Sequence, residues 1–266
     1  MALAESSTKV FREDGFLVLS KFFEHSEVDE MREEAVPGLW ADRRVPWMDG
    51  EPIGDREITA VHYPHLVSTV LSGFANSRRI REVAELYCSA HLVAARHAST
   101  KLVQSMYYAK PPGALGQRWH QDERFTPTRD ASLLTVWIAL DDADEENGCL
   151  FVVPGSQRPL ELVPHTRFDS DDEVVRGEGI QEPRCSQPLI LETGDVAIFS
   201  GYMVHGSRRN RSNRSRRSLV LNFQRGCVPT ISGRSCECGA SIDLSFDEND
   251  ELLDHENDIR SRILAR

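Results

Sequence analysis

The sequence predicts a mainly β protein with a double-stranded β-helix core, the jelly-roll or cupin-like fold, and flanking α-helices. Two observations carry this prediction. From Leu102 onward, short apolar runs alternate with turns rich in Gly, Pro, Asn and Asp, as in all-β domains. Before that point, apolar residues recur at helical spacing instead. The strand-like runs are 102–109, 132–140, 149–153, 188–191, 196–200 and 217–224.

The first hundred residues are expected to alternate between helical and irregular segments. Gly15 ends a short helical start, and residues 16–19 have the composition of a first strand. Ser26 is expected to cap a helix, with an aspartate three residues later as in a capping box. Four prolines make 37–66 irregular. Ser77 is expected to cap a second helix, whose apolar face is formed by Ile80, Val83, Ala84 and Tyr87.

The length of 266 residues favours a single domain, with two small domains as the alternative. We expect a helical N-terminal part at about 1–100, a jelly-roll core at about 101–226 and a C-terminal tail at 227–266. Hydrophobic residues make up 40% of the chain and charged residues 27%, which is ordinary for a globular protein.

The net charge of −11 argues against a general nucleic-acid binder and against adhesion to anionic membranes. No apolar stretch approaches the ~20 residues of a membrane span. The N-terminus lacks a basic segment followed by an apolar run, so no secretory signal is expected. These observations predict an intracellular, cytoplasmic protein.

Six cysteines in a chain without a secretory signal are expected to be free thiols rather than a disulfide framework. Cys227, Cys236 and Cys238 could be interpreted as part of a zinc site. Their spacing is not the paired two-residue gap of common structural zinc sites, so ordinary thiols are the expectation.

Three residues are candidate metal ligands: His120, Asp122 and His205. If His120 and Asp122 lie on one strand, their side chains point to the same face and Gln121 points away. His205 would then reach the same ion from a distant strand. Two neutral imidazoles and one carboxylate suit Fe(II) with open coordination positions. A bidentate organic cosubstrate and dioxygen could take those positions. The structural alternative is a satisfied polar network inside the jelly roll.

Arg216 follows His205 by eleven residues and leads into an apolar run that is expected to be a buried strand. A buried guanidinium needs an anionic partner, because an unpaired buried charge is costly. Its planar fork matches a carboxylate with two hydrogen bonds. The far carboxylate of a dicarboxylic cosubstrate would satisfy it.

From about Val10 to about Gln224 the chain resembles the phytanoyl-CoA dioxygenase family of iron- and 2-oxoglutarate-dependent oxygenases. The motifs that carry the resemblance occur in order and at suitable spacing. They are Phe11-Arg12-Glu13-Asp14-Gly15-Phe16-Leu17-Val18-Leu19, Lys110-Pro111-Pro112, Trp119-His120-Gln121-Asp122, Trp137-Ile138-Ala139-Leu140, Glu146-Asn147-Gly148-Cys149-Leu150, Val153-Pro154-Gly155-Ser156 and His205-Gly206-Ser207, followed by Asn210 and Arg216.

The resemblance implies that His120, Asp122 and His205 hold the iron. It also implies that Arg216 binds the distal carboxylate of 2-oxoglutarate. Some relatives that halogenate lack the acidic ligand, so the aspartate here disfavours halogenation. Further cosubstrate-pocket positions implied by the resemblance are Ser207, as a hydroxyl donor, Lys110, Trp137 and Gln104.

The expected function is therefore an Fe(II)- and 2-oxoglutarate-dependent dioxygenase. It would use O2 to oxidise, by default to hydroxylate, a small metabolite, with natural-product biosynthesis as the preferred setting, and would release succinate and CO2. Two alternatives stay open: a metal-dependent cupin-type enzyme that does not use 2-oxoglutarate, and a non-catalytic jelly-roll ligand-binding protein. The sequence predicts neither the substrate nor the oligomeric state.

Two segments have two interpretations each. Residues 155–187 are long for a loop in a compact domain and are either a lid over the pocket or a solvated excursion. The run from Ser207 to Arg217 carries six arginines. It is either an anion-binding patch or, as we prefer for an acidic chain, a solvated loop with one buried arginine.

Three residues that follow the first two candidate ligands also have two interpretations. Arg124, Phe125 and Arg129 either face substrate or pack within a loop.

Overall fold

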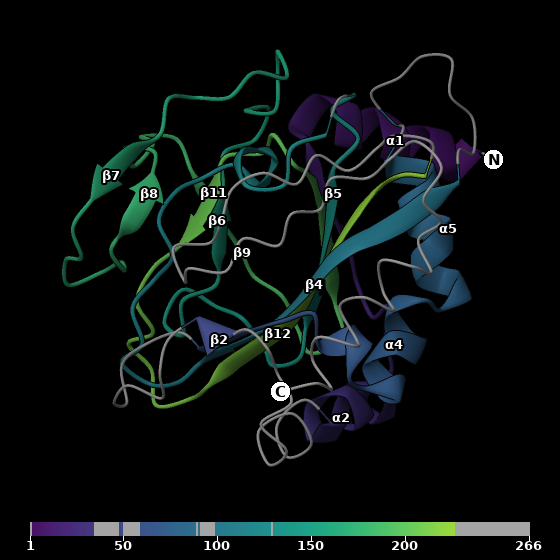
Figure 1. Ribbon diagram of the computed structural model, residues 1–266, viewed down its shortest axis with the longest axis horizontal. Coiled ribbons are helices and arrows are strands. Elements are labelled where there is room, and N and C mark those ends of the chain that lie inside the picture. Colours follow the sequence, from purple (N-terminus) through teal and green to yellow (C-terminus); the bar gives the residue numbers. More distant parts are fainter. Residues whose placement is uncertain are drawn as a thin grey trace, which may run out of the picture.

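Seven strands form the larger of two antiparallel sheets in the computed structural model, which describes residues 2–34, 48–49, 59–88, 90, 99–128 and 130–226 (Figure 1). Antiparallel pairing runs through the whole sheet. In spatial order its strands are β1 (Phe16–Leu19), β10 (Val196–Ser200), β5 (Leu134–Ala139), β12 (Arg216–Arg225), β4 (Thr100–Lys110), β3 (Thr59–His62) and β2 (Met48–Asp49).

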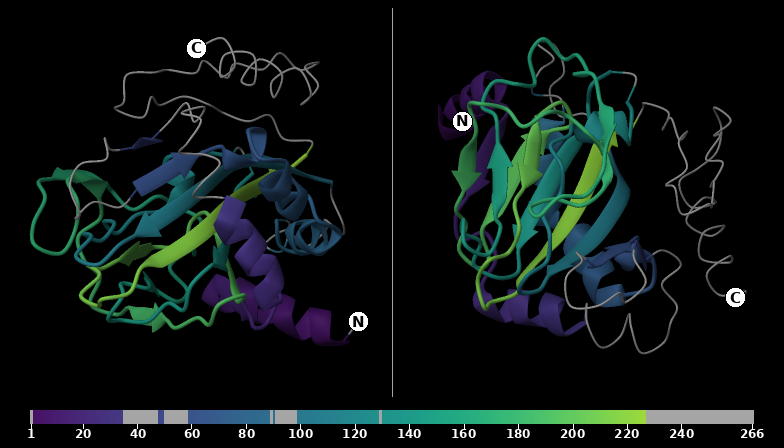
Figure 2. Two further views of the ribbon diagram at one scale, coloured as in Figure 1. Left: turned by 90° about the horizontal axis from the view of Figure 1, so that it is seen from below. Right: turned by 90° about the vertical axis from the view of Figure 1, so that its left-hand side faces the viewer.

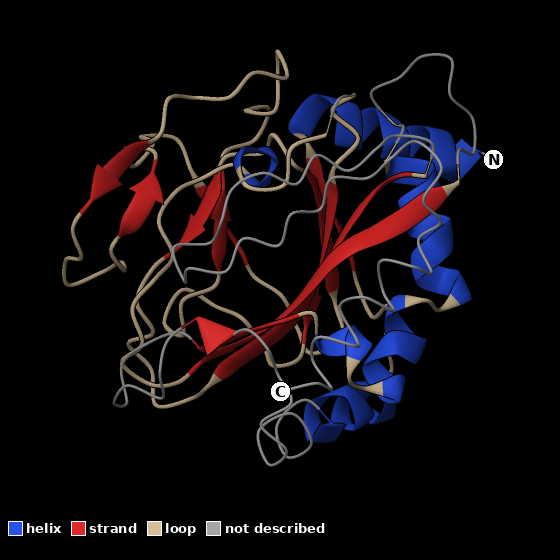
Figure 3. Ribbon diagram, viewed as in Figure 1, coloured by secondary structure: helices blue, strands red, loops and turns tan. Residues whose placement is uncertain are grey.

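The smaller sheet packs against one face of the larger sheet, and a short hairpin lies beyond it (Figure 3). Its strands are β11 (His205–Ser207), β6 (Leu150–Val152) and β9 (Gln187–Leu189), and the hairpin pairs β7 (Thr166–Phe168) with β8 (Gly177–Gly179). Two facing antiparallel sheets confirm the predicted mainly β, jelly-roll architecture.

Helices cover the opposite face of the larger sheet (Figure 2). They are α1 (Ala2–Asp14), α2 (His25–Glu33), α4 (Thr69–Ala75) and α5 (Arg78–Tyr87), with short 3-10 turns η3 (Pro64–Leu66) and η4 (Asp122–Arg124). None of the helices in the described ranges has the length and apolar character needed to cross a membrane.

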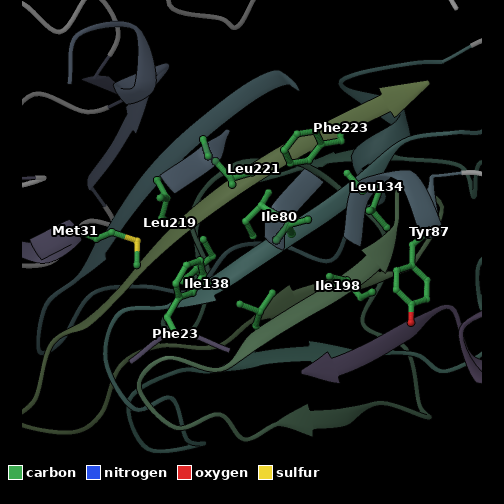
Figure 4. Close-up of a cluster of buried hydrophobic side chains, with 14 of the residues drawn as sticks. Phe23, Met31, Ile80, Tyr87, Leu134, Ile138, Ile198, Leu219, Leu221 and Phe223 are labelled. Atoms are coloured by element: carbon green, nitrogen blue, oxygen red, sulfur yellow. The ribbon is translucent and has the colours of Figure 1, made fainter. Parts of the chain in front are cut away.

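The period-two alternation of the central strands separates two apolar cores. On β12, Leu219, Leu221 and Phe223 face the helices and pack with residues such as Met31 and Ile80 (Figure 4). The residues between them point into the space between the two sheets. Strands β5 and β10 alternate in the same way, with Val136 and Ile198 outside and Trp137 and Phe199 inside. Polar side chains on the inner face are therefore held by strands that are anchored from behind by the helical core.

Several local predictions are confirmed and one is wrong. Helix α1 ends at Gly15, whose φ of 83° is in the left-handed region that glycine tolerates. Helix α5 follows Ser77 and buries the predicted apolar face, although the serine side chain makes no capping hydrogen bond. Helix α2, however, begins two residues earlier than predicted. Glu24, not Ser26, is its N-cap and forms the capping box with Glu27.

Two regions expected to be irregular contain regular structure. Strand β3 extends the large sheet beside β4, within the proline-containing segment 37–66. The segment 155–187 contains the β7–β8 hairpin. Strand β3 forms because it pairs with the distant strand β4, and β7 and β8 form because they pair with each other as a hairpin. In both cases the pairing overrides weak local strand propensity, so the sequence alone did not indicate these strands.

Three predictions lie wholly or partly outside the described residues. They are the tail at 227–266, the cysteines at 227, 236 and 238, and Arg129. The cysteines within the described ranges, Cys88, Cys149 and Cys185, are free thiols, as expected.

Candidate active site

The backbone brings the first and third predicted ligands side by side. His120 and His205 form an isolated antiparallel bridge, with N–O distances of 2.8 and 3.0 Å between their amides and carbonyls. His205 is the first residue of β11, whereas Asp122 opens the 3-10 turn η4. The expectation that one regular strand carries both His120 and Asp122 is therefore only half right. Gln121 between them is still extended, with φ of −123° and ψ of 129°, so both side chains turn to the same side before the chain enters the 3-10 turn at Asp122.

The three side chains converge on one point. The distance from Asp122 Oδ1 is 3.4 Å to His120 Nε2 and 3.6 Å to His205 Nε2. One ligand atom from each residue lies within 4.8 Å of the other two. The two imidazole rings are 4.2 Å apart between centroids and are almost fully buried. Each of the three donors is within coordination reach of a single ion placed between them.

The hydrogen bonds on the far sides of the rings define which nitrogens face that point. His120 Nδ1 lies 2.7 Å from the carbonyl oxygen of Arg118, and His205 Nδ1 lies 3.0 Å from that of Met203. A carbonyl only accepts, so both Nδ1 atoms carry the proton in the neutral rings. Both Nε2 lone pairs then point at the carboxylate. Three electron-rich atoms facing one another are the donor set that a divalent cation would stabilise.

The local electrostatics favour the protonation states that a metal ion needs. Burial and the neighbouring His120 lower the pKa of His205 to about 4, so this ring is neutral at pH 7. Burial alone would raise the pKa of Asp122. The two imidazoles and the Thr135 hydroxyl outweigh burial and hold the pKa of Asp122 well below its usual range. A neutral imidazole and an ionised carboxylate are the forms that bind a metal.

A hydrogen-bond chain from the large sheet fixes the carboxylate of Asp122. Asn222 Nδ2 on β12 donates to Thr135 Oγ1 on β5 over 3.0 Å. The hydroxyl of Thr135 in turn donates to Asp122 Oδ2 over 2.5 Å. Because Oδ2 is occupied, Oδ1 is the oxygen left to face the imidazoles. Sequence analysis missed Thr135 and Asn222. The available signal was alternation, which puts a polar Thr135 on the same face as Trp137.

Gln121, between the two ligands in sequence, points away from them, as expected. Its side chain is buried and holds three backbone groups. Nε2 donates to the carbonyls of Glu161 and Tyr202, at 3.1 and 2.8 Å, and Oε1 accepts from the amide of Val163 at 2.8 Å. This side chain therefore attaches the beginning of the 155–187 segment to the metal-binding turn.

Arg216 is the buried arginine that the sequence predicts. It is 3% exposed, lies at the start of β12 and faces the space between the sheets. Its guanidinium carbon lies 5.4 Å from the centre of the Trp137 ring. Among the described residues, its Nη1 makes one long hydrogen bond of 3.3 Å to Ser218 Oγ, and its Nε has no partner. Burial lowers the pKa of Arg216 to about 10, so it stays charged at pH 7. The pocket thus holds a cation without an acidic partner.

The neighbouring Arg217 has a different environment. It points the other way and makes two hydrogen bonds of 2.7 Å to the carboxylate of Asp141. Arg217 is therefore satisfied by the fold itself, and Arg216 is the one that is not.

Lys110 and Ser207 lie beside Arg216 but are already engaged. Lys110 pairs with Arg216 across β4 and β12, and its Nζ donates to Ser207 Oγ at 3.0 Å, to the Gly148 carbonyl at 3.1 Å and to the carbonyl of Arg208. Burial and the adjacent Arg216 lower the pKa of Lys110. Ser207 Oγ also accepts from the amide of Gln117. The lysine thus braces β11, and the serine hydroxyl retains one proton to donate.

Trp137 and Gln104 line the same interior at two different places. Trp137 lies against Arg216, and Gln104 Nε2 lies 3.4 Å from His62 Nδ1 on β3. The β3 strand that brings His62 there was not foreseen.

The arginine-rich run from Ser207 to Arg217 forms ion pairs with the 155–187 segment. Arg208 contacts Glu182 at 2.9 Å, and Arg211 forms an ion pair with Glu173. Other described arginines are paired as well, among them Arg118 with Asp171, Arg124 with Glu178, Arg214 with Asp144 and Arg225 with Asp130. The preferred interpretation, a solvated loop with one buried arginine, agrees with this arrangement.

Comparisons with known proteins agree with this geometry. A sequence model of the phytanoyl-CoA dioxygenase family (PhyH) matches residues 11–218. The rice protein phytanoyl-CoA dioxygenase 1 is 33% identical over 128 residues, which are 48% of this chain and 46% of the rice protein. The peroxisomal phytanoyl-CoA dioxygenase of Bos taurus is 24% identical over 240 residues, covering 83% of this chain and 68% of that protein.

Solved structures share the fold at low sequence identity. The epimerase SnoN, crystallised with Fe3+, alpha ketoglutarate and nogalamycin RO, superposes with a TM-score of 0.68 at 22% identity and 86% coverage of both chains. EctD from S. alaskensis, crystallised with 2-oxoglutarate and 5-hydroxyectoine, gives a TM-score of 0.64 at 20% identity, covering 83% of this chain and 75% of EctD. Because the family match extends over most of the 266 residues, the chain belongs to the phytanoyl-CoA dioxygenase family.

Proposed function

We propose that this chain is an Fe(II)- and 2-oxoglutarate-dependent dioxygenase that oxidises a small molecule. One observation carries the proposal. Two imidazole Nε2 atoms and one carboxylate oxygen converge in the same interior as a buried guanidinium that lacks an acidic partner. A cation site and an anion site inside one barrel match a metal ion and a dicarboxylate bound together.

The roles of the individual residues follow from their contacts. His120, Asp122 and His205 would hold Fe(II) through Nε2, Oδ1 and Nε2. Arg216 would bind the distal carboxylate of 2-oxoglutarate, with Ser207 donating its free hydroxyl proton. Ser207 lies two residues beyond His205 on β11, a step of about 7 Å along a strand. That step is about the length of a five-carbon diacid. Trp137 would flank the cosubstrate through its contact with Arg216, and Lys110 would hold Ser207 in place.

Iron bound at this site would supply the activation of dioxygen, with 2-oxoglutarate as the two-electron donor. The balanced reaction converts R–H, 2-oxoglutarate and O2 into R–OH, succinate and CO2. The protein's part is to keep His205 neutral and Asp122 ionised, to orient Asp122 Oδ1 through Thr135, and to neutralise the cosubstrate with Arg216. Packing of Phe199 against the His205 ring helps to keep that ligand out of bulk water.

The proposal is tested by anaerobic calorimetry followed by a turnover assay. The full-length protein should bind Fe(II) with one site, and 2-oxoglutarate should bind in the presence of Fe(II). Under air, slow uncoupled formation of succinate should follow. Asp122→Ala should lose iron binding, whereas Arg216→Met should keep iron binding and lose 2-oxoglutarate binding. Full activity of Asp122→Ala would refute the assignment of the ligands.

Two rival functions give different results in the same assay. A metal-dependent cupin-type enzyme without 2-oxoglutarate would bind metal but form no succinate. A non-catalytic ligand-binding relative would bind neither Fe(II) nor 2-oxoglutarate. The unpaired Arg216 beside the three candidate ligands supports the oxygenase, because 2-oxoglutarate brings a chelating group for the metal and a second carboxylate for the guanidinium in one molecule.

The setting of the reaction is a further part of the proposal. A cytoplasmic enzyme of natural-product biosynthesis is supported by relatives of the same fold, SnoN and the carbocyclase SnoK, which come from nogalamycin biosynthesis. The matched part of the rice relative is less than half of that protein. The activity is therefore proposed from the site of this chain rather than from the name of that relative. Purification of the native complex and identification of co-purifying metabolites would test this setting.

A further inference from the structure

One polar atom near the candidate metal site has no role in the proposed reaction. His165, in the 155–187 segment, places Nδ1 2.8 Å from the carbonyl oxygen of Val163. The carbonyl can only accept, so Nδ1 carries the proton and Nε2 presents a bare lone pair. Nε2 is shielded from solvent and has no hydrogen-bond partner among the described residues. A buried acceptor without a donor is costly in a folded protein, and a ligand that donates a hydrogen bond would satisfy it.

The position of His165 relates this atom to the reacting centre. Its ring packs edge-on against Phe125, with centroids 6.1 Å apart, and Phe125 packs edge-on against His120 at 5.8 Å. The ring is therefore one aromatic side chain removed from a candidate iron ligand. Gln121 anchors the segment just before it by holding the backbone of Glu161 and Val163.

Large exposed apolar side chains adjoin this imidazole. Phe125, 50% exposed, is in ring contact with it, and Leu162 and Val163, 43% and 38% exposed, precede it by three and two residues. Neighbouring exposed apolar side chains favour contact with an apolar ligand. We name these three residues the apolar lip.

The charges around the lip are neutralised in pairs. Arg124 contacts Glu178 at 3.1 Å, and Arg118 is held by Asp171 together with the carbonyl of Asp169. Arg208 and Arg211 are paired with Glu182 and Glu173. Because these arginines already have acidic partners, each is a weaker site for a polyanionic substrate such as a phosphate-rich thioester.

We propose that the substrate is uncharged and largely apolar, lies against the apolar lip, and donates a hydroxyl or N–H hydrogen bond to His165 Nε2. This inference rests on the proposed function, since it names the substrate class of the same site. His165 is then a specificity-determining residue, and the beginning of the 155–187 segment forms the substrate side of the pocket. Burial lowers the pKa of His165, which keeps the acceptor form populated at pH 7.

Three matched probes test the proposal: 2-naphthol, 2-methoxynaphthalene and 2-naphthyl phosphate. They share one apolar ring system and differ in carrying a donor, no donor and a dianion. Dissociation constants are measured by anaerobic equilibrium dialysis against the full-length protein loaded with Fe(II) and 2-oxoglutarate. We expect 2-naphthol to bind about five- to tenfold more tightly than 2-methoxynaphthalene, the ratio that one net hydrogen bond supports. The phosphate should bind no more tightly than 2-methoxynaphthalene.

Two variants locate the effect. His165→Phe keeps an aromatic ring against Phe125 but removes the acceptor, and it should abolish the preference for 2-naphthol while leaving 2-methoxynaphthalene within twofold. His25→Phe makes the same replacement at an exposed position on α2 and should keep the preference. Phe125→Ser should weaken both neutral probes to a similar extent.

The proposal is overturned if the neutral probes bind alike, if the preference survives in His165→Phe, if the phosphate binds best, or if no probe binds. Fe(II) and 2-oxoglutarate affinities are measured on the same samples. Normal affinities show that His165→Phe is folded. Loss of the probe pattern with cofactor binding intact refutes only the substrate class, whereas absence of cofactor binding in the unmodified protein refutes the proposed function.

Discussion

Replacing Thr135 with valine removes one hydroxyl from the hydrogen-bond chain that orients Asp122. The shapes of the two side chains are nearly the same, so the packing of β5 should persist. The change deletes the 2.5 Å hydrogen bond to Asp122 Oδ2 and leaves Asn222 Nδ2 without its acceptor. We predict a weaker metal site in a protein that still folds.

The magnitude follows from the kind of bond that is lost. A hydrogen bond to an ionised carboxylate contributes about 1.5–3 kcal/mol, which corresponds to about 10- to 100-fold in an equilibrium constant. The same range is typical when an outer partner of a metal ligand is removed. The unpaired amide of Asn222 should cost a further ~1–3 kcal/mol of folding stability. Thr135→Val should therefore lower the Fe(II) affinity about 10- to 100-fold. It should also lower the free energy of unfolding by ~1–3 kcal/mol.

The assay separates these two effects. Fe(II) affinity is measured by anaerobic calorimetry, and the stability of the metal-free protein by urea unfolding. Thr135→Ser should restore most of the affinity, because it returns the hydroxyl. Thr128→Val is the matched control. Its hydroxyl donates over 2.7 Å to Glu123, the residue after Asp122, so the variant should lose stability but keep its Fe(II) affinity. An Fe(II) affinity of Thr135→Val within twofold of the unmodified protein would show that the chain does not orient the ligand.

Three further predictions follow from the described contacts. Arg216→Met should weaken 2-oxoglutarate binding at least 30-fold, about 2 kcal/mol, without lowering the melting temperature of the apo protein. Arg217→Met should lower the free energy of unfolding in urea by about 1–2 kcal/mol and leave 2-oxoglutarate binding intact. Loss of 2-oxoglutarate binding in Arg217→Met but not in Arg216→Met would refute the assignment. Burial raises the pKa of Glu123 to about 7 from 4.5, so its protonated form stabilises the fold below about pH 4.5 and that stability is lost as the pH rises through 7. Glu123→Gln should flatten this decline in unfolding midpoints, and an unchanged slope would contradict it. Leu221→Ala should cost about 2–5 kcal/mol by opening a cavity behind the site, and a loss below 1 kcal/mol would contradict the packing shown in Figure 4.

The parts of the site that sequence reasoning found are those where chemistry restricts the residue type. Two imidazoles and a carboxylate at separated positions have few uses other than a metal site, and an arginine entering an apolar strand demands an anion. The alternation of β5 and β12 also predicts which side chains face inward. Composition and spacing were therefore enough to predict the jelly roll and to nominate the three metal-ligand candidates and Arg216, whereas the other pocket positions were implied only by the family resemblance.

The rest depended on which segments lie side by side. Nothing local to Thr135 or Asn222 indicates that they meet, because the register of β5 against β12 is a long-range property. The N-cap of α2 was misplaced because Ser26 has the better capping propensity, whereas Glu24 and Glu27 satisfy each other's backbone amides. The pairing of acidic and arginine-rich segments was likewise invisible until the fold placed them together.

The Gln121 side chain links the metal-binding turn to the beginning of the 155–187 segment, and on the far side it contacts only backbone atoms. Because it holds the carbonyls of Glu161 and Tyr202 and the amide of Val163, it makes no demand on the side chains of the residues that it anchors. Positions 162, 163 and 165 can therefore be exchanged while the backbone track stays fixed. For enzyme redesign, the backbone of this segment can stay fixed while its side chains change. A small library of substitutions at these three positions is therefore the natural place to seek altered substrate selectivity.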